Sequence, residues 1–388
     1  MLKIKSGSYT YKIVDATINL SYDTVADTFA FRYRKEGKAP SRPLQYQDVD
    51  LTYGNALIMK GTALSTFEDD SAVPSPASMG GYSITGILED CQIVEFPIFF
   101  QGFTTKQVAQ MICDYFGIQL VVDDTVKEVC NIVLNNTNAD PMQTAKDYLS
   151  TLCKQINVVL SHTDDGKLLL TQSKAIPKEV SDLYKQQPKQ QPINDIAYPQ
   201  ADNKIEWIDN RYREKNPPIA SFDTVDGGEI FTRMSVRTDG QRMHGNIKVI
   251  QQANVNSVQS YIINPYVGQN AKLFTPKLIA GSAYRQRAVV QTADIADYKQ
   301  LTAKNVLSDE LKSISLVIEV PRWVIGNHLI RPNNLITVRN PNVGLNKVGT
   351  WFIDKVTLSC SADRETAVIT CCLPDCYNNE IPVANVFS

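Results

Sequence analysis

Alternating apolar and polar residues predict β-strands over the first hundred residues of the chain. The run Thr28–Tyr33 alternates strictly, and a period of two places the apolar side chains on one face of a strand. Asp69–Gly81 is rich in Ser, Pro and Gly and predicts an exposed loop, and Tyr82–Cys91 predicts the next strand. We therefore expect residues 1–103 to form an N-terminal β-barrel.

The period changes to that of helices after residue 103. Thr104 is a predicted N-cap, and Gly117 is placed to end that helix. A second helix is predicted to begin with Asp140 as N-cap and Pro141 as its first residue, before a hairpin that turns at 163–166. The apolar face of the second helix consists of Ala145, Tyr148, Leu149, Leu152 and Cys153. Residues 104–173 are therefore predicted to be an α+β insert.

The middle of the chain begins with a proline-rich stretch. Prolines block both helices and strand ladders, so the proline density of residues 174–203 predicts an extended connector. Residues 204–312 mix strand-like runs with the longest helix candidate, Thr292–Lys312. We expect this mixed α/β region to complete the barrels in part.

Short strands and tight turns return in residues 313–388, the predicted C-terminal β-barrel. Gly326-Asn327 and Pro332–Asn334 supply turn chemistry between runs rich in Val and Ile. The sequence Ile87–Cys91 at the end of the first barrel is echoed by Cys372–Cys376 at the end of the second. The predicted fold class is mainly β with an α+β insert, in which two similar β-barrel domains are joined by smaller α/β domains.

Composition narrows the class of protein. The chain has 388 residues, a net charge of −2 and a pI near 6.0, which argues against a tight nucleic-acid binder. The N-terminus lacks the apolar core of a signal peptide, and no apolar run approaches the length of a membrane span. The eight cysteines form no Cys-x-x-Cys pair, so we expect buried, reduced thiols and folding in a cytoplasm.

The sequence offers little catalytic chemistry. It contains no nucleophile elbow, P-loop, dinucleotide fingerprint or zincin motif. His162, His244 and His328 are interpreted as surface or turn residues, and Cys153 as a core residue rather than the thiol of a Cys–His pair with His162. We expect no enzyme activity, no cofactor, no metal and no small-molecule substrate. The adjacent acids Glu68–Asp70, Asp123-Asp124 and Asp164-Asp165 are read as solvated turns, and Trp207, Trp323 and Trp351 as buried aromatics rather than a carbohydrate site.

One C-terminal motif resembles a known family. A Trp, a Gly-x-x-Leu-x-x-Pro-Asn-x-Leu-Ile turn, a Val-x-x-Pro and a Trp-x-Ile-x-x-Val strand are similar to the C-terminal barrel of contractile-phage baseplate hub proteins, the Mu-type tail hubs of the late-control and spike-hub family. The 104–173 segment resembles the helical insert of those hubs. The motif residues are Trp323, Gly326, Leu329, Pro332, Asn333, Leu335, Pro341, Trp351 and Ile353, and Leu329 stands where family members often have Trp.

The resemblance implies a structural protein of the virion, located in the tail baseplate and assembled in the host cytoplasm. Such hubs form a homotrimeric ring in which two like barrels per subunit present six similar units to the tail tube protein. The other face holds the trimeric spike protein, and wedge proteins surround the ring. DNA passes through the channel without tight binding, so we expect no dense Lys/Arg lining.

Two alternatives remain open at the level of sequence. A tail-associated peptidoglycan hydrolase would use the adjacent acids as a carboxylate pair. A hub of a related contractile injection system, a tailocin or a secretion system, would share every feature noted above.

Overall fold

The computed structural model describes residues 1–35, 45–69, 71, 76–92, 102–134, 140, 142–174, 217–251, 258–264, 266, 286–291, 298–377 and 386–387. These residues form two compact units. Unit 1 comprises residues 1–172 with 321–323 and 355–368, and unit 2 comprises 173–320, 324–354 and 369–388. The predicted connector, residues 174–203, lies outside the described residues apart from Lys174.

Unit 1 begins with seven strands that carry the predicted alternation. In β4, the side chains of Phe29, Phe31 and Tyr33 are buried and the residues between them are exposed. Tyr11 packs edge-on against Phe31 and Tyr33, so an aromatic cluster fills this face of the sheet. The strands are β1 (Leu2–Ser6), β2 (Tyr9–Thr10), β3 (Lys12–Ser21), β4 (Thr28–Arg34), β5 (Asp48–Tyr53), β6 (Ala56–Glu68) and β7 (Pro76–Ser83).

The glycine-rich stretch before residue 83 is a strand, so the loop predicted for Asp69–Gly81 is wrong over its second half. The strand predicted for Tyr82–Cys91 is also wrong, because a 3₁₀ turn, η1 (Ile84–Gly86), and the short helix α1 (Ile87–Asp90) follow β7. A Cβ atom on Gly81 would lie 2.0 Å from the carbonyl oxygen of Thr62 and 2.9 Å from the ring of Phe29. These glycines therefore make room for a neighbouring aromatic side chain and do not form a turn.

The α+β part of unit 1 follows the predicted helices closely. Helix α2 (Thr105–Phe116) begins with a capping box between Thr104 and Gln107 and ends at Gly117, whose φ is +66°. The second helix, α4 (Ala145–Gln155), is capped by Thr144 and not by Asp140. Its predicted apolar face is buried at every position. The remaining elements are β8 (Leu120–Val122), η2 (Asp124–Val126), α3 (Lys127–Cys130), β9 (Val159–His162) and β10 (Leu168–Thr171).

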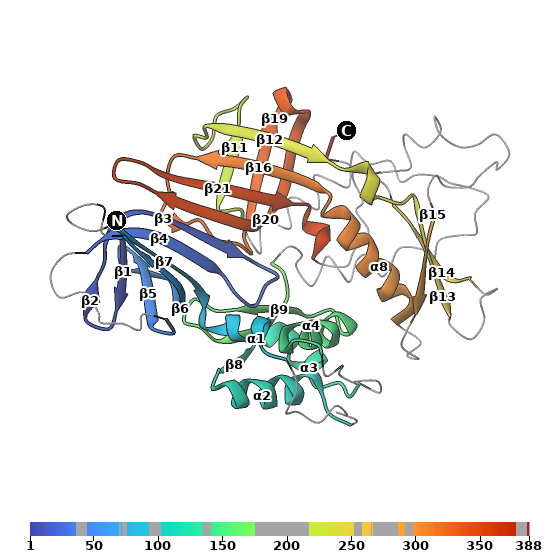
Figure 1. Ribbon diagram of the computed structural model, residues 1–388. Helices are drawn as coiled ribbons and strands as arrows, with labels where there is room; N and C mark the ends of the chain where they lie inside the picture. The colour runs from blue at the N-terminus through green and yellow to red at the C-terminus, as the bar shows by residue number, and fades with distance from the viewer. Residues whose placement is uncertain are drawn as a thin grey trace. The chain divides into compact units, whose positions relative to one another are not determined.

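Strand β10 joins local and distant parts of the chain. It pairs antiparallel with β9, as the predicted hairpin requires, and parallel with β8 on its other edge. The helices α2 and α4 and this three-stranded sheet enclose one apolar core that includes Val108, Ile112 and Leu149. Figure 1 shows this group of helices and short strands together.

Unit 2 contains a second set of sheet strands and a smaller three-stranded sheet. The smaller sheet has the order β14-β13-β15, and helix α8 (Tyr298–Leu311), the described part of the predicted 292–312 helix, packs on it (Figure 1). The strands of the unit are β11 (Ala220–Asp223), β12 (Arg233–Thr238), β13 (Asn246–Gln251), β14 (Val258–Ile263), β15 (Gln286–Gln291), β16 (Ile314–Val320), β17 (Val324–Ile325), β18 (His328–Leu329), β19 (Leu335–Asn340), β20 (Leu345–Cys360) and β21 (Glu365–Cys372). Strands β20 and β21 contribute residues to both units.

The main sheet has 13 strands in the order β12-β16-β21-β20-β3-β4-β7-β6-β5-β1-β2, with β11 beside β19 and β19 beside β20. The chain is therefore mainly β, as predicted, and its strands form a large, mostly antiparallel sheet. No pairing between described strands closes this sheet into either of the two predicted barrels. Closure of a first barrel would require a free edge on β3, but that edge pairs with Lys355–Cys360 of β20.

Among the described residues, no helix has both the length and the apolar character that a membrane span requires.

Candidate functional site: motif residues and strand edges

Trp323 from the C-terminal motif is a buried anchor in unit 1. Its side chain has no exposed surface, and its indole Nε1–H donates to the carbonyl oxygens of Ser359, at 3.1 Å, and Thr366, at 3.0 Å. The ring of Tyr53 lies 5.1 Å away. Tyr53 in turn donates to the Glu365 carboxylate at 2.7 Å, and burial together with that bond raises the pKa of Tyr53 to about 12. Trp323 therefore ties β5, β20 and β21 together.

Gly326 and Leu329 form the tight hairpin β17–β18. Val324 pairs with Leu329 and Ile325 with His328, which leaves Gly326 and Asn327 as a two-residue turn. Gly326 has a φ of +57°, the conformation that the first central residue of such a turn requires. The Gly-x-x-Leu part of the motif is thus turn chemistry.

Pro332 and Asn333 form the corner before β19. Asn333 adopts a left-handed conformation with φ of +57°, which Asn tolerates better than most residues. Its backbone N–H donates to the carbonyl of Ile353 at 3.0 Å, and its side-chain oxygen accepts the backbone N–H of Lys174 at 3.0 Å. The corner therefore holds the backbone of Lys174, the first residue of the predicted connector, beside the start of β19.

The remaining motif residues supply core and a second turn. Leu335, Trp351 and Ile353 are buried in β19 and β20, where Leu335 pairs with Phe352 and Ile336 with Trp351. Pro341 is exposed and starts a 3₁₀ turn, η5 (Pro341–Val343), that Asn340 caps. Burial of Trp323 and Trp351 rules out the carbohydrate-site reading for these two residues, and Trp207 lies outside the described residues.

The catalytic candidates are held in structural contacts. Cys153 is buried in the α4 face, as predicted, and burial raises the pKa of its thiol. Asp123 caps η2 and accepts from the hydroxyl groups of Thr125 and Thr171; burial opposes ionisation, but these hydrogen bonds more than offset it and lower the pKa of Asp123. Asp165 binds Lys167 at 2.8 Å at a hairpin tip. The eight cysteines are free thiols, and six of them are buried.

Two histidines differ from the prediction that all three are surface or turn residues. His162 is buried beside Asp27, at 3.0 Å, and His244 donates to Glu310, at 2.7 Å, a buried carboxylate that also binds Arg287 at 3.1 Å. His328 is exposed, as predicted. Long-range folding decides these burials, because each partner lies more than 60 residues away in sequence. In the contacts described, neither imidazole bonds a serine, threonine or cysteine side chain.

The main sheet contains one strand order twice. In the first strand set, β3 to β7, the order is β5-β6-β7-β4-β3, and in the second strand set, β12, β16, β19, β20 and β21, it is β19-β20-β21-β16-β12. Across each set, the strands are the third, fourth, fifth, second and first of that set in chain order, so each strand has a counterpart in the other set. The predicted echo between the two halves is therefore seen in the topology, although Ile87–Cys91 forms a helical turn while Pro374–Cys376 forms the 3₁₀ turn η6.

The two sets differ at their edges. Strand β20 pairs with β19 through its first half and with β3 through Lys355–Cys360. Its counterpart β6 pairs with β5 as far as Thr62, and no described strand pairs with Ser65–Phe67 on that edge. Strand β12, the counterpart of β3, pairs only with β16 among the described strands. The side chain of Phe67 is 63% exposed.

The α+β part of unit 1 matches a known domain family. Residues 85–172 match the family model "Baseplate hub protein gp44-like, second domain". No curated protein matches the sequence.

Solved structures similar to this chain include tail proteins. A 43 kDa tail protein of prophage MuSo2 from Shewanella oneidensis is 17% identical, with a TM-score of 0.69 over 97% of this chain and 99% of that one. A tail protein from Neisseria meningitidis MC58 is 15% identical, with a TM-score of 0.70 over 98% of each chain. The Escherichia coli c3393 protein, a component of the type VI secretion system, is 10% identical, with a TM-score of 0.51 over 96% of this chain and 76% of that one. The resemblance to the Mu-type baseplate hubs is confirmed.

Proposed function

We propose that this protein is the structural hub of a contractile-tail baseplate. In this role it forms a ring of three copies that adapts the sixfold tail tube to the trimeric spike and leaves a channel for DNA. The match of residues 85–172 to a baseplate hub domain and the tail-protein fold support the hub assignment. The repeated strand order is the observation that carries the ring. Three copies of a chain with two like strand sets present six like units, which is the number a sixfold tube requires.

The strand edges suggest how the ring closes. Within one chain, β3 of the first strand set adds to the free stretch of β20 in the second. If the same contact repeats between copies, β12 of one copy adds to Ser65–Phe67 of β6 in the next, a stretch with which no described strand pairs on that edge. Such a contact is head-to-tail, and it closes into a ring when the rotation between units is 60°. Backbone hydrogen bonds supply the affinity of an added strand, as in other cases of β-augmentation.

The proposed partners follow from that arrangement. The tail tube protein lies on one face of the ring, the trimeric spike on the other, and wedge proteins around it. We propose a channel wall without a dense Lys/Arg lining, because each fixed cation would bind a phosphate of the passing DNA. We propose the virion baseplate as its location, after assembly in the host cytoplasm, and a role without catalysis.

A related injection system is the second candidate. The c3393 protein shows that this fold also occurs in a type VI secretion component. Both candidates require the same ring and the same strand contact, and they differ in whether the assembled particle carries DNA.

A proline in β12 tests the strand contact. The backbone N–H of Asp239 donates to Ser313, and the antiparallel register pairs Val236 with Leu316. Since hydrogen-bonded and non-hydrogen-bonded pairs alternate along such a ladder, the N–H of Val236 points away from β16. Val236→Pro therefore removes an outward donor and leaves the bonds within the chain intact.

We expect light scattering of the wild-type protein bound to its spike to give the mass of three hub copies in addition to that of the spike, and Val236→Pro to stay at one hub copy. Val236→Ala, which shortens the side chain but keeps the N–H, is the matched control and is expected to assemble. An unchanged circular dichroism spectrum and melting temperature show that the proline variant is folded. Assembly of Val236→Pro to the same mass as Val236→Ala would refute the strand contact. A wild-type mass other than three copies would refute the ring.

A further inference from the structure

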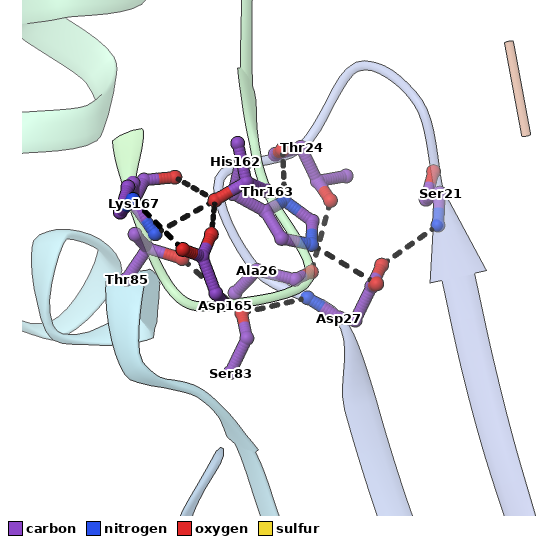
Figure 2. Close-up of polar contacts among 10 residues, drawn as sticks. All are labelled: Ser21, Thr24, Ala26, Asp27, Ser83, Thr85, His162, Thr163, Asp165 and Lys167. Carbon is purple, nitrogen blue, oxygen red and sulfur yellow. Dashed lines mark hydrogen bonds and ion pairs between the residues drawn. The ribbon is translucent and has the colours of Figure 1, made fainter. Parts of the chain in front are cut away.

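The side chain of His162 is almost fully buried where the baseplate hub domain, residues 85–172, contacts the N-terminal strands, β1 to β7. Its side chain is 6% exposed and that of Asp27 is 9% exposed. His162 ends β9, whereas Thr24 and Asp27 lie in the connection between β3 and β4. Figure 2 shows the imidazole inserted between this connection and the hairpin that bears it. A histidine in a buried contact of this kind is unusual unless both ring nitrogens are satisfied.

Both ring nitrogens of His162 face acceptors. Nε2 lies 3.0 Å from the carboxylate oxygen Oδ2 of Asp27, and Nδ1 lies 3.1 Å from the carbonyl oxygen of Thr24. A neutral imidazole carries one N–H, so it can satisfy only one of them. The other carboxylate oxygen of Asp27 accepts the backbone N–H of Ser21 at 2.9 Å. The geometry therefore favours an imidazolium, which can donate to both acceptors.

The electrostatic balance agrees with the geometry. Burial lowers the pKa of His162, but the hydrogen bond and charge of Asp27, the carbonyl of Thr24 and the charge of Asp164 more than offset it. The net effect raises the pKa above its ordinary value of 6.5.

The hairpin that carries His162 touches the N-terminal strands at further points. The backbone N–H of Lys60 in β6 donates to the carbonyl of Asp164 at 2.9 Å. A Cβ atom on Gly166 would lie 3.0 Å from the side chain of Ile84, which shows how closely the hairpin approaches η1. Ser83, beside Ile84, bonds the backbone of Asp27 in both directions. The His162 contact is thus part of a wider docking surface between this hairpin and the N-terminal strands.

We propose that His162, Asp27 and Thr24 form a proton-dependent latch that holds the baseplate hub domain against the N-terminal strands. When His162 loses its proton, one of the two buried acceptors loses its donor, and the hairpin contact weakens. The domain is then free to move relative to the strands while each part stays folded. The latch depends on these contacts alone and not on the ring.

The other charged groups named around the latch are carboxylates and lysines, and none is a histidine. Asp164, Asp165 and Lys167 lie on the hairpin, Asp23 and Asp27 on the β3–β4 connection, and Lys60 on β6. Carboxylates stay ionised and lysines protonated between about pH 6 and pH 9. The folded-state pKa of His162 is raised, so its stabilisation is complete below about pH 6.5 and is lost as pH rises through the folded-state value.

Histidine NMR on the full-length chain tests the protonation state. The chain has only three histidines, so ring signals can be assigned with single variants. We expect His162 to titrate above 6.5 and to shift to or below 6.5 in Asp27→Asn, which keeps the shape of the side chain but removes its charge. A wild-type His162 that titrates at or below 6.5 would refute the proposal. The wild-type titration stands as a test whether or not Asp27→Asn folds.

Hydrogen exchange tests the mechanical consequence. After correction for the intrinsic pH dependence of exchange, we expect residues 157–171 and 21–28 to lose protection between pH 6 and pH 9, because the contact weakens as His162 loses its proton. In Asp27→Asn the protection should be low and independent of pH. His328→Gln, a change of an exposed histidine, should reproduce the wild-type profile. If the hydrogen-exchange protection of the wild type does not change with pH, the latch is refuted, even if His162 titrates as expected by NMR.

Discussion

In the first strand set the connection between the first two strands is a turn of six residues, 22–27, whereas in the second set it contains β13, β14, β15 and α8. The order of the five strands is nevertheless the same in both sets. Strand order depends on which backbone edges meet, and insertions at strand ends leave those edges unchanged. The comparison shows that the repeated element is the sheet pattern, while the connections carry what differs between the two halves.

The largest expected difference concerns glycine. In the first set, a Cβ on Gly81 would lie 2.0 Å from the backbone oxygen of Thr62, and backbone cannot move aside cheaply. We expect Gly81→Ala to cost about 3 kcal/mol in the free energy of unfolding, measured in urea. In the second set, a Cβ on Gly349 meets its nearest neighbour at 3.6 Å, so Gly349→Ala is the matched control and is expected to be neutral or slightly stabilising. Equal losses in both variants would show that crowding by Phe29 and Thr62 is not what requires glycine.

A smaller difference in the free energy of unfolding is expected between variants of the two buried tryptophans. Trp323 donates to two backbone carbonyls, while Nε1 of Trp351 has no partner among the described residues. We expect Trp323→Phe to cost about 1 kcal/mol more than Trp351→Phe, because only the first change leaves buried acceptors without a donor. Urea denaturation of the two variants gives the difference directly. A larger loss for Trp351→Phe would contradict this account of the motif.

The smallest expected effect tests a feature that both sets share. The connection before the long strand carries a left-handed glycine in each, Gly54 with φ of +59° and Gly344 with φ of +81°. Neither glycine has an atom within 4 Å of a built Cβ. Backbone strain alone predicts that Gly54→Ala and Gly344→Ala each cost about 1 kcal/mol, and that the Asn variants cost less. Thermal unfolding checks both pairs, and a loss of several kcal/mol at either site would point to contacts that strain does not explain.

Local chemistry in the sequence determined the elements whose signals are short-range. Thr104, Gln107 and Gly117 define helix α2 through bonds that span at most four residues, and the Gly326-Asn327 turn needs only its own two residues. The alternation in β4 and the apolar face of α4 also follow from period alone, and they are confirmed. The start of α4 was predicted wrongly because two capping residues, Asp140 and Thr144, stand four residues apart and either satisfies the local rule.

Tertiary structure decided which edges and polar groups meet. The parallel pairing of β10 with β8, the pairing of β3 with β20 and the pairing of β7 with β4 join residues that lie from about 40 to more than 300 positions apart. The same holds for His162, whose sequence context resembles an exposed hairpin but whose ring meets Asp27 across 135 residues of chain. A strand edge or a buried acceptor can accept many different partners, and no residue type in the sequence specifies which one. The local sequence therefore determines which strands and turns form, and tertiary packing determines what each of them contacts.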